Sequence, residues 1–201
     1  MGNYVVTISR QFASFGRSIA QKMSEELEIE FYDRDIVEAT AKRMGQPIPV
    51  ISNEEENSNS MFFRRKYPLG MGVANMQDEI FNVQANIIRD IAKRESCIIV
   101  GRCAGSVLKD YEKVLNIYIY APYECRLKNC TDVLQMDPKV AKKMIKEIDK
   151  ARENYRYHYC PEVDNVYDGY DIMIDSSRFG AEKSAKILTG IVKSTIMDSI
   201  V

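Results

Sequence analysis

The stretch NYVVTISRQFASFGRS (residues 3–18) decides the fold. Residues 3–9 form a continuous β-rich, largely apolar run, which is typical of a strand buried on both faces of a sheet. A turn-like stretch follows, and Ile19, Met23 and Leu27 then recur at the spacing of one helix face. A buried strand, a tight turn and a helix in this order predict the first unit of an α/β protein.

The same alternation continues along the chain. Further strands are predicted at residues 29–32, 97–100, 114–120 and 171–174, and helices at 18–27, 34–44, 73–95, 101–109, 137–157 and 181–197, with another from Pro122. The acidic and polar residues 52–60 are expected to form a mobile surface loop. Strands that alternate with helices predict a parallel sheet covered on both faces, whose ligands bind beyond the carboxyl ends of the strands.

The composition argues against several functional classes. The 201 residues carry 28 Lys and Arg against 29 Asp and Glu, so the basic excess of a dedicated DNA-binding protein is missing. The single histidine, His158, does not suffice for the usual zinc sites and makes a Ser-His-Asp triad improbable. We therefore expect any chemistry to use carboxylates, Arg, Lys, backbone amides and a metal brought by the ligand.

The cysteines and the apolar segments indicate the compartment. The five cysteines (residues 97, 103, 125, 130 and 160) include no CxxC motif, so we interpret them as reduced thiols. The N-terminal residues lack the features of a signal peptide, and no apolar run is long enough to span a membrane. We expect a cytoplasmic protein.

The loop after the first strand has features of a phosphate-binding loop. Gly16-Arg17-Ser18 is similar to the end of the pattern GxxxxGK[ST], with Arg in place of Lys, and Gln11 stands where the first Gly would be. Such a loop combines a strand, a tight turn, a cation, a hydroxyl and a helix N-terminus. A plain strand-to-helix turn explains these residues equally well.

Three further groups follow predicted strands or lie on the basic helix. Asp33 suits either a substrate hydrogen bond or the N-cap of the next helix. Gly101 permits a tight exit from its strand and places Arg102 at the binding edge of the sheet. Arg152 and Arg156 share one helix face, which is also explained by a solvated basic surface. Arginines converging on one edge favour phosphate binding, and phosphoryl transfer needs no histidine.

The chain as a whole resembles the cytidylate kinase-like family of P-loop nucleoside monophosphate kinases. The matching motifs lie in residues 8–20, 31–33, 98–102, 120–126, 149–159 and 170–177. The resemblance implies an α/β fold with a three-layer α/β/α P-loop kinase core and a parallel sheet. It also implies one domain over residues 1–201, with an acceptor-binding insertion at 46–95 and a helical lid at 137–165.

The resemblance further implies ATP and Mg²⁺, and phosphoryl transfer to a nucleoside monophosphate such as CMP. By position, it assigns the ATP phosphates to the loop residues Arg10, Ala13, Ser14, Phe15, Gly16, Arg17 and Ser18, with Ser18 approaching Mg²⁺ through water. It assigns the acceptor to Asp33, Gly101 and Arg102. The catalytic set is Arg17, Arg102, Arg152, Arg156 and Asp33.

Several departures from the family pattern keep other functions open. Ala13 and Phe15 replace two glycines of the usual SRxxGSGG loop, and a β-carbon at a position with positive φ costs about 1 kcal/mol. These changes favour a pseudo-kinase that binds a nucleotide or anion without turnover. A weaker alternative is an RNA- or membrane-surface protein that uses residues 62–66. The apolar face of the helix at 73–95 suits a homodimer interface as well as a core.

Overall fold

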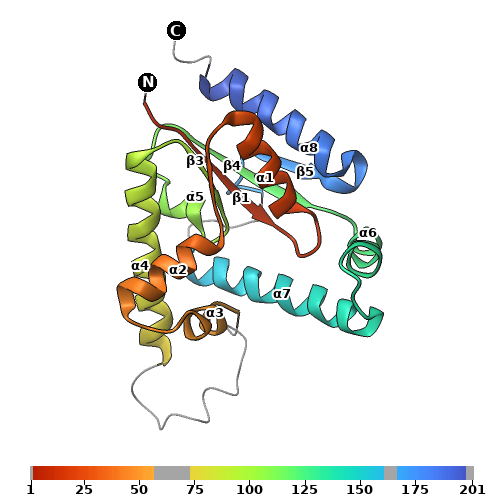
Figure 1. Ribbon diagram of the computed structural model, residues 1–201, viewed down its shortest axis with the longest axis horizontal. Helices are drawn as coiled ribbons and strands as arrows, with labels where there is room; N and C mark the ends of the chain where they lie inside the picture. The colour runs from red at the N-terminus through yellow and green to blue at the C-terminus, as the bar shows by residue number, and fades with distance from the viewer. Residues whose placement is uncertain (1, 57–72, 161–166, 198–201) are drawn as a thin grey trace.

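A parallel five-stranded sheet forms the centre of the molecule (Figure 1). The computed structural model describes residues 2–56, 73–160 and 167–197. The strands are β1 (Val5–Arg10), β2 (Glu30–Tyr32), β3 (Cys97–Val100), β4 (Val114–Tyr120) and β5 (Ile172–Asp175), in the order β2-β3-β1-β4-β5. Every neighbouring pair is parallel, so the carboxyl ends of the strands meet at one edge. The predicted parallel α/β architecture is confirmed.

Helices follow each strand and connect it to the next. They are α1 (Gly16–Leu27), α2 (Arg34–Met44), α3 (Ile48–Glu56), α4 (Val73–Arg94), α5 (Ala104–Val107), α6 (Tyr123–Lys128), α7 (Pro138–Tyr159) and α8 (Ser176–Val192). The π-helical turns η2 (Asn129–Val133) and η3 (Lys193–Met197) continue α6 and α8. None of the helices in the described ranges is long and apolar enough to cross a membrane.

The helices cover both faces of the sheet and form the two outer layers. On one face α1 and α8 pack against the sheet, with Ile8, Ile19 and Leu188 in the buried cluster. On the other face α4 and α5 pack against β3, with Ile88 and Ile99 in the cluster. Burial of each such side chain stabilises the fold by about 1.5–3 kcal/mol. The predicted three-layer core is therefore confirmed, and the apolar face of α4 is used inside the chain.

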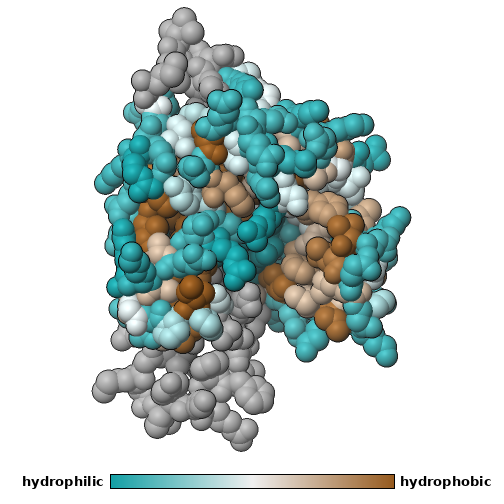
Figure 2. Space-filling view, in the orientation of Figure 1, coloured by the Kyte–Doolittle hydropathy of each residue, from teal (hydrophilic) through white to brown (hydrophobic). Residues whose placement is uncertain are grey.

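The helix α7 lies beyond the carboxyl ends of the strands, across the edge of the sheet (Figure 1). Its residues Ala141 and Ile145 form a small buried cluster with Cys130 of η2. Phe12 and Ala13 of the loop after β1 pack against this cluster. The sheet edge and α7 therefore enclose the loop between them. Beside this loop, between α1 and α6, the surface is hollowed, with hydrophilic side chains on one side of the hollow and hydrophobic ones on the other (Figure 2).

The predicted surface loop at residues 52–60 is wrong over its first part. The helix α3 extends through Glu56, because Ile51 is fully buried against Val37, Ala41 and Ile80 and fixes the helix to α2 and α4. Pro49 stands in its first turn, where the missing N–H has no intrahelical acceptor to lose. Residues 57–60, and the Phe62–Lys66 segment of the RNA- or membrane-surface alternative, lie outside the described residues.

Smaller differences concern the ends of helices. The helix α1 begins at Gly16, earlier than predicted. The last helix begins at Ser176, because the Asp175 carboxylate accepts a hydrogen bond of 2.9 Å from the N–H of Ser177 and caps it. A kink follows at Gly180, whose φ is 69°. The periodicity alone detected only the part of α8 beyond this kink.

Candidate functional site

The loop between β1 and α1 (residues 11–15, the β1–α1 loop) is anchored to the end of β4. The N–H of Gln11 donates to the Ile119 carbonyl at 3.0 Å, and the Gln11 side chain accepts from the N–H of Ala121 at 3.1 Å. Ser14 is buried, and its hydroxyl is the donor to two carbonyl oxygens. These are the carbonyl of Gln11 at 2.9 Å and the carbonyl of Ile119 at 3.1 Å. Ser14 therefore uses its hydroxyl to hold the shape of the loop.

Two residues of this loop adopt the left-handed conformation that glycine adopts without strain. The φ of Ala13 is 59° and that of Phe15 is 60°. The ring of Phe15 is partly buried and packs against the core cluster of β1 and α1. The loop thus keeps a conformation suited to glycine at about 1 kcal/mol of strain per residue, and the core receives the ring.

The first turn of α1 follows the loop and carries unsatisfied backbone donors. No side chain in the described ranges caps this helix start. Gly16 is buried, whereas Arg17 and Ser18 are exposed. An uncapped helix N-terminus combines N–H donors with the positive end of the helix dipole, and a cation beside it adds to the attraction for phosphate.

Asp33 is the centre of the arginine cluster, which consists of Asp33 with Arg10, Arg17, Arg102 and Arg152. Arg102 Nη1 donates to the Asp33 carboxylate at 3.0 Å, and Arg17 Nε and Arg10 Nη2 lie 3.5 and 3.6 Å from it. Asp33 occupies the N-cap position of α2, but its side chain caps no N–H within the described residues. The N-cap role is therefore not the one that the carboxylate takes, and its ion pairs with the arginines were not predicted from the sequence.

The side chain of Arg10 passes two glycines on its way to Asp33. A β-carbon at Gly16 would lie 2.7 Å from Arg10 Cβ, and one at Gly101 would lie 2.5 Å from Arg10 Nη1. Both positions must be glycine for Arg10 to lie there. Burial is the main cause that lowers the pKa of Arg10 to about 9, and the positive charge of Arg152 is the second; the negative charge of Asp33 raises it. The positive charge of the buried Arg10 guanidinium is thus only partly balanced by Asp33.

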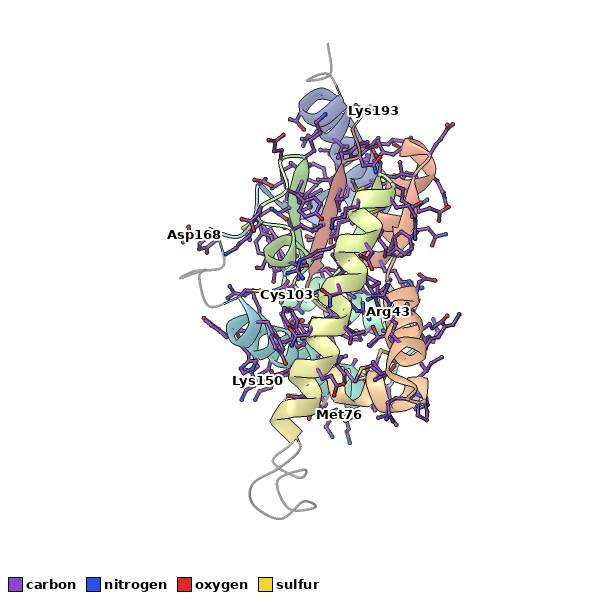
Figure 3. The ribbon with its side chains drawn as sticks, turned by 90° about the vertical axis from the view of Figure 1, so that its left-hand side faces the viewer. Arg43, Met76, Cys103, Lys150, Asp168 and Lys193 are labelled. Carbon is purple, nitrogen blue, oxygen red and sulfur yellow. The ribbon has the colours of Figure 1, made fainter. Side chains whose placement is uncertain are left out.

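The turn after β3 presents Arg102 to Asp33. Gly101, Arg102 and Cys103 have positive φ angles of 83°, 53° and 52° in succession. Arg102 Nη1 donates also to the carbonyl of Val100 at 3.2 Å. Gly101 thus makes the tight exit that the sequence predicts. Cys103 lies between α5 and α7 (Figure 3), so this turn also faces the helix across the sheet edge.

The helix α7 contacts the β1–α1 loop through two side chains of one face. Arg152 Nη1 donates to the Arg10 carbonyl at 3.0 Å, and burial lowers the pKa of Arg152. One turn earlier, the Asp149 carboxylate accepts a hydrogen bond of 2.7 Å from the N–H of Phe12 and pairs with Arg126 of α6. Asp149 therefore links the loop, α6 and α7.

Arg156 lies one turn beyond Arg152 on α7. Its Nη1 atom is buried and has no hydrogen-bond partner among the described residues. Its Cζ lies 4.8 Å from the centre of the Tyr157 ring. A buried donor without a partner costs free energy that an anion at this position would recover.

The site therefore has an excess of positive charge. Three guanidinium groups contact the single carboxylate of Asp33, and Arg152 is near enough to respond to its charge. The charge of Asp149 is already balanced by Arg126. Buried cations without full compensation fit a polyanionic ligand such as the phosphate chain of ATP.

The described part of the protein offers few side chains that could bind a metal ion. The described residues contain no group of three or more His, Cys, Asp or Glu that could hold a metal ion. The hydroxyl of Ser18, exposed in the first turn of α1, is a suitable oxygen beside the loop. This arrangement fits Mg²⁺ that arrives with phosphates and keeps most of its water ligands.

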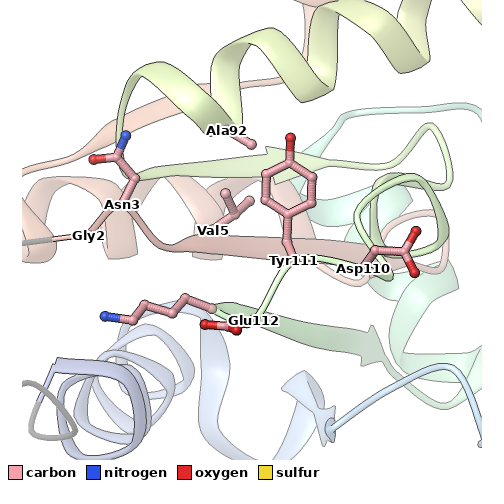
Figure 4. Close-up of a pocket in the computed structure, with 8 residues that line it drawn as sticks. Gly2, Asn3, Val5, Ala92, Asp110, Tyr111 and Glu112 are labelled. Atoms are coloured by element: carbon pink, nitrogen blue, oxygen red, sulfur yellow. The ribbon is translucent and has the colours of Figure 1, made fainter.

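A shallow pocket of about 480 Å³ lies at the opposite edge of the sheet (Figure 4). It is lined by Gly2, Asn3 and Val5 at the start of β1, and by Tyr111 and Lys113 before β4, among others. This pocket is at the amino ends of the strands, whereas ligands of parallel sheets bind at the carboxyl ends. We therefore place the candidate site at the arginine cluster.

The five-stranded parallel sheet with its helices is the fold of P-loop kinases, as similar solved structures show. A shikimate kinase from Bacteroides thetaiotaomicron has a TM-score of 0.58 at 11% identity, covering 94% of this chain and 98% of that chain. A gluconokinase from Sinorhizobium meliloti has a TM-score of 0.55 at 10% identity, with 99% and 98% covered. An uncharacterized protein from Eubacterium ventriosum has a TM-score of 0.71 at 23% identity, with 96% and 99% covered.

The chain belongs to the cytidylate kinase-like family, whose sequence pattern matches residues 5–178. No curated protein sequence matches the chain. Family membership and the P-loop kinase fold together support phosphoryl transfer as the general class of chemistry.

The residues predicted from the sequence divide into two groups in space. Arg10, Arg17, Asp33 and Arg102 meet directly, and Arg152 joins them through the Arg10 carbonyl. Arg156 lies farther along α7, near the pair Cys103 and Cys160. The sequence reasoning missed Asp149 and Arg126 as site residues. A usable signal was the spacing of Asp149 and Arg152, which places an acid on the same helix face as a site arginine.

Proposed function

We propose that this protein transfers the γ-phosphoryl group of ATP to a nucleoside monophosphate, with CMP as the first acceptor to test. The observation that carries the proposal is the excess of guanidinium groups around the buried carboxylate of Asp33. Phosphoryl transfer depends on positioning and charge neutralisation, and it requires no acid–base histidine. Arginine presents planar pairs of N–H donors that match phosphate oxygens.

On the ATP side, the β1–α1 loop and the first turn of α1 would hold the phosphates. Ala13, Ser14, Phe15 and Gly16 would contribute through the backbone, since the Ser14 hydroxyl is engaged within the protein. Arg17, with a 58% exposed side chain, would replace the usual lysine. Ser18 would approach Mg²⁺ through water, and the metal would supply further neutralisation of the phosphate charge.

On the acceptor side, Arg102 would bind the monophosphate, and Asp33 would hold the Arg102 side chain in the orientation that this requires. Arg102 is only 12% exposed and is held by Asp33 and the carbonyl of Val100, so its position is set before a ligand arrives. Gly101 lets the backbone come close at this point. The segment 46–95 would form the rest of the acceptor site, and 137–165 the lid.

In the reaction, an oxygen of the acceptor phosphate attacks the γ-phosphorus of ATP. The bond from that phosphorus to the oxygen bridging the β-phosphate breaks, and ADP leaves with the electron pair. Arg17 and Arg102 would neutralise charge from the side of the sheet. Arg152 and Arg156 would do so from α7, where Arg156 Nη1, without a partner in the described part of the chain, offers a donor.

A pseudo-kinase is the second candidate, and a specific observation favours it. Ala13 and Phe15 adopt positive φ angles in the loop, so this loop is stiffer than a glycine-rich one, and both side chains pack against apolar clusters. Such a protein would bind ATP or another anion through the same arginines without turnover.

Both candidates are tested by incubating the full chain with ATP, Mg²⁺ and each of CMP, dCMP, UMP, AMP and GMP, and measuring ADP and the product diphosphate. A kinase gives both products in equal amounts with at least one acceptor, and Arg102→Ala abolishes them. Arg34→Ala, which removes an exposed arginine at the start of α2, is the matched control and should retain activity. Binding of ATP without product from any acceptor would support the pseudo-kinase. Failure to bind millimolar ATP would refute both.

A further inference from the structure

Three aromatic rings join the C-terminal end of α7 to α4. Phe81 of α4 stacks on Tyr159 of α7, with the ring centres 4.1 Å apart and an angle of 12° between the ring planes. Tyr155, one turn earlier on α7, packs edge-on against Phe81 at 6.2 Å and lies 4.6 Å from the Tyr159 ring. Figure 1 shows this end of α7 beside α4. We call these three rings the α4–α7 stack.

A hydrogen bond accompanies the rings and joins residues 81 positions apart. The Tyr159 hydroxyl donates to the Asp78 carboxylate at 3.0 Å, and Asp78 lies one turn before Phe81 on α4. His158 Nε2 lies 3.3 Å from the same carboxylate, but both side chains are 50% exposed or more, so this surface pair contributes little. Burial, and next the hydrogen bond to Asp78, raise the pKa of Tyr159, so its hydroxyl keeps the proton that it donates.

The two ends of α7 have separate attachments. At the C-terminal end, Phe81 packs also against the buried cluster of α4, α5 and β3, so the rings fix α7 to the main body of the protein. At the N-terminal end, Ala141 and Ile145 are buried against Cys130 of η2. Because different residues make the two attachments, one can open while the other stays closed.

Arg156 lies on the part of α7 that the rings hold. It follows Tyr155 directly and precedes Tyr159 by three positions, so contacts that fix these two rings also fix its turn of the helix. Its buried Nη1 has no hydrogen-bond partner among the described residues. A donor contributes most to binding an anion when its position is set before the anion arrives.

We propose that Asp78, Phe81 and Tyr159 are positioning residues that hold the C-terminal turns of α7 on α4 and so place Arg156 at the carboxyl edge of the sheet. When this attachment opens, these turns are released while the Cys130 end of α7 stays in place. The effect on phosphoryl transfer rests on the proposed function, whereas the attachment itself does not.

The test is alkylation of the native full chain with iodoacetamide, followed by tryptic digestion and mass spectrometry. Cys160, the C-cap residue of α7, is only 6% exposed, so it reacts when this end of the helix opens. It is measured on peptide 157–178, and Cys130, on peptide 129–139, reports the other end. Phe81→Ala should raise the rate at Cys160 about tenfold and leave the rate at Cys130 near that of wild type.

A second variant and two controls guard against an effect on overall stability. Asp78→Ala removes the acceptor of the Tyr159 hydroxyl and changes no ring, so it should raise the rate at Cys160 about threefold. Glu79→Ala, at the exposed next position of α4, is the control for loss of an acid and should match wild type. Val83→Ala removes apolar volume that packs against the same buried cluster, and it should leave the ratio of the two labelling rates unchanged.

A selective rise at Cys160 in Phe81→Ala and Asp78→Ala supports the proposal. Unchanged labelling, or an equal rise at Cys130, would overturn it. In an active chain, Phe81→Ala should also lower kcat about tenfold with little change in KM for ATP. A wild-type kcat in a variant with faster labelling would overturn the positioning of Arg156. Because the labelling does not involve ATP, an inactive wild-type chain whose variants label as expected would refute only the proposed function.

Discussion

Arg102 donates a hydrogen bond of 3.0 Å to the carboxylate of Asp33, across 69 positions of sequence. This contact joins the ends of two neighbouring strands, β2 and β3, at the carboxyl edge of the sheet. Arg10 and Arg17 reach the same carboxylate from the end of β1 and the start of α1. Asp33 therefore organises cations from three segments, and it leaves part of their positive charge uncompensated at the carboxyl edge of the sheet.

Removal of the Asp33 charge should destabilise the fold and make it depend on added anions. Asp33→Asn leaves the arginines of the cluster without their carboxylate, at a cost of about 3 kcal/mol in the free energy of unfolding. Sulfate should restore part of this loss, relative to chloride at the same ionic strength, because it replaces the missing negative charge. Urea unfolding measures both effects. Asp35→Asn, at an exposed position of α2, should change little, and a similar loss in that variant would contradict the account.

Gly101→Ala should lower the free energy of unfolding more than Gly45→Ala, a substitution at another glycine with positive φ. The new methyl would lie 2.5 Å from Arg10 Nη1, so Arg10 must shift away from Asp33. The expected loss is about 2–4 kcal/mol from strain and overpacking combined. Gly45 has a φ of 62° and open space around it, so Gly45→Ala should cost only about 1 kcal/mol. Equal losses in thermal or urea unfolding would show that Arg10 does not require Gly101.

Asp149→Asn should disturb the β1–α1 loop, which the Asp149 carboxylate contacts from α7. The asparagine can still accept from the N–H of Phe12, but it leaves the buried Arg126 without its counter-charge, which costs about 3 kcal/mol in stability. The shifted loop should lower turnover with ATP about tenfold, equivalent to ~1.4 kcal/mol in the barrier. Glu153→Gln, on the exposed face of the same helix, is the control for loss of an acid and should match wild type. Unchanged stability of Asp149→Asn would argue against the role given to this carboxylate.

Alkylation of Cys160 should begin at lower pH than alkylation of an ordinary cysteine. The thiolate reacts and the thiol does not, and a hydrogen bond from the Cys103 side chain lowers the pKa of Cys160, so the rate should rise and level off at lower pH. In Cys103→Ala the main hydrogen bond to the thiolate is lost, so the pKa should rise and the midpoint should move to higher pH. Iodoacetamide labelling, quantified on peptide 157–178, gives both profiles. A midpoint that does not move would exclude Cys103 as the donor.

The sequence predicts the fold well because the relevant signals are local. The strand periodicities and the alternation with helices are sufficient for the parallel sheet, and the motif order indicates the family. The helix α3 was missed because its reason for existing is Ile51, which packs against Val37 and Ile80 from distant segments. Local composition at residues 52–56 suggests a loop, and tertiary burial overrides it.

The site is predicted in its residues but less well in their roles. The arginines were found from their places at strand ends and on one helix face. The sequence could not show that Arg10 fills the space above Gly16 and Gly101, since that depends on side-chain paths between two loops. The contact of Asp149 with the Phe12 amide could not be predicted from the sequence either, because the two residues are 137 positions apart.

A crystal structure of the full chain with a non-hydrolysable ATP analogue, Mg²⁺ and CMP tests the central claim most directly. The account predicts the phosphates of the analogue along the β1–α1 loop and the start of α1, and the CMP phosphate within hydrogen-bond distance of Arg102. It also predicts a contact from Arg152 or Arg156 to a phosphate oxygen. Nucleotide bound at the pocket of Asn3 and Lys113 instead, with none at the arginine cluster, would contradict it.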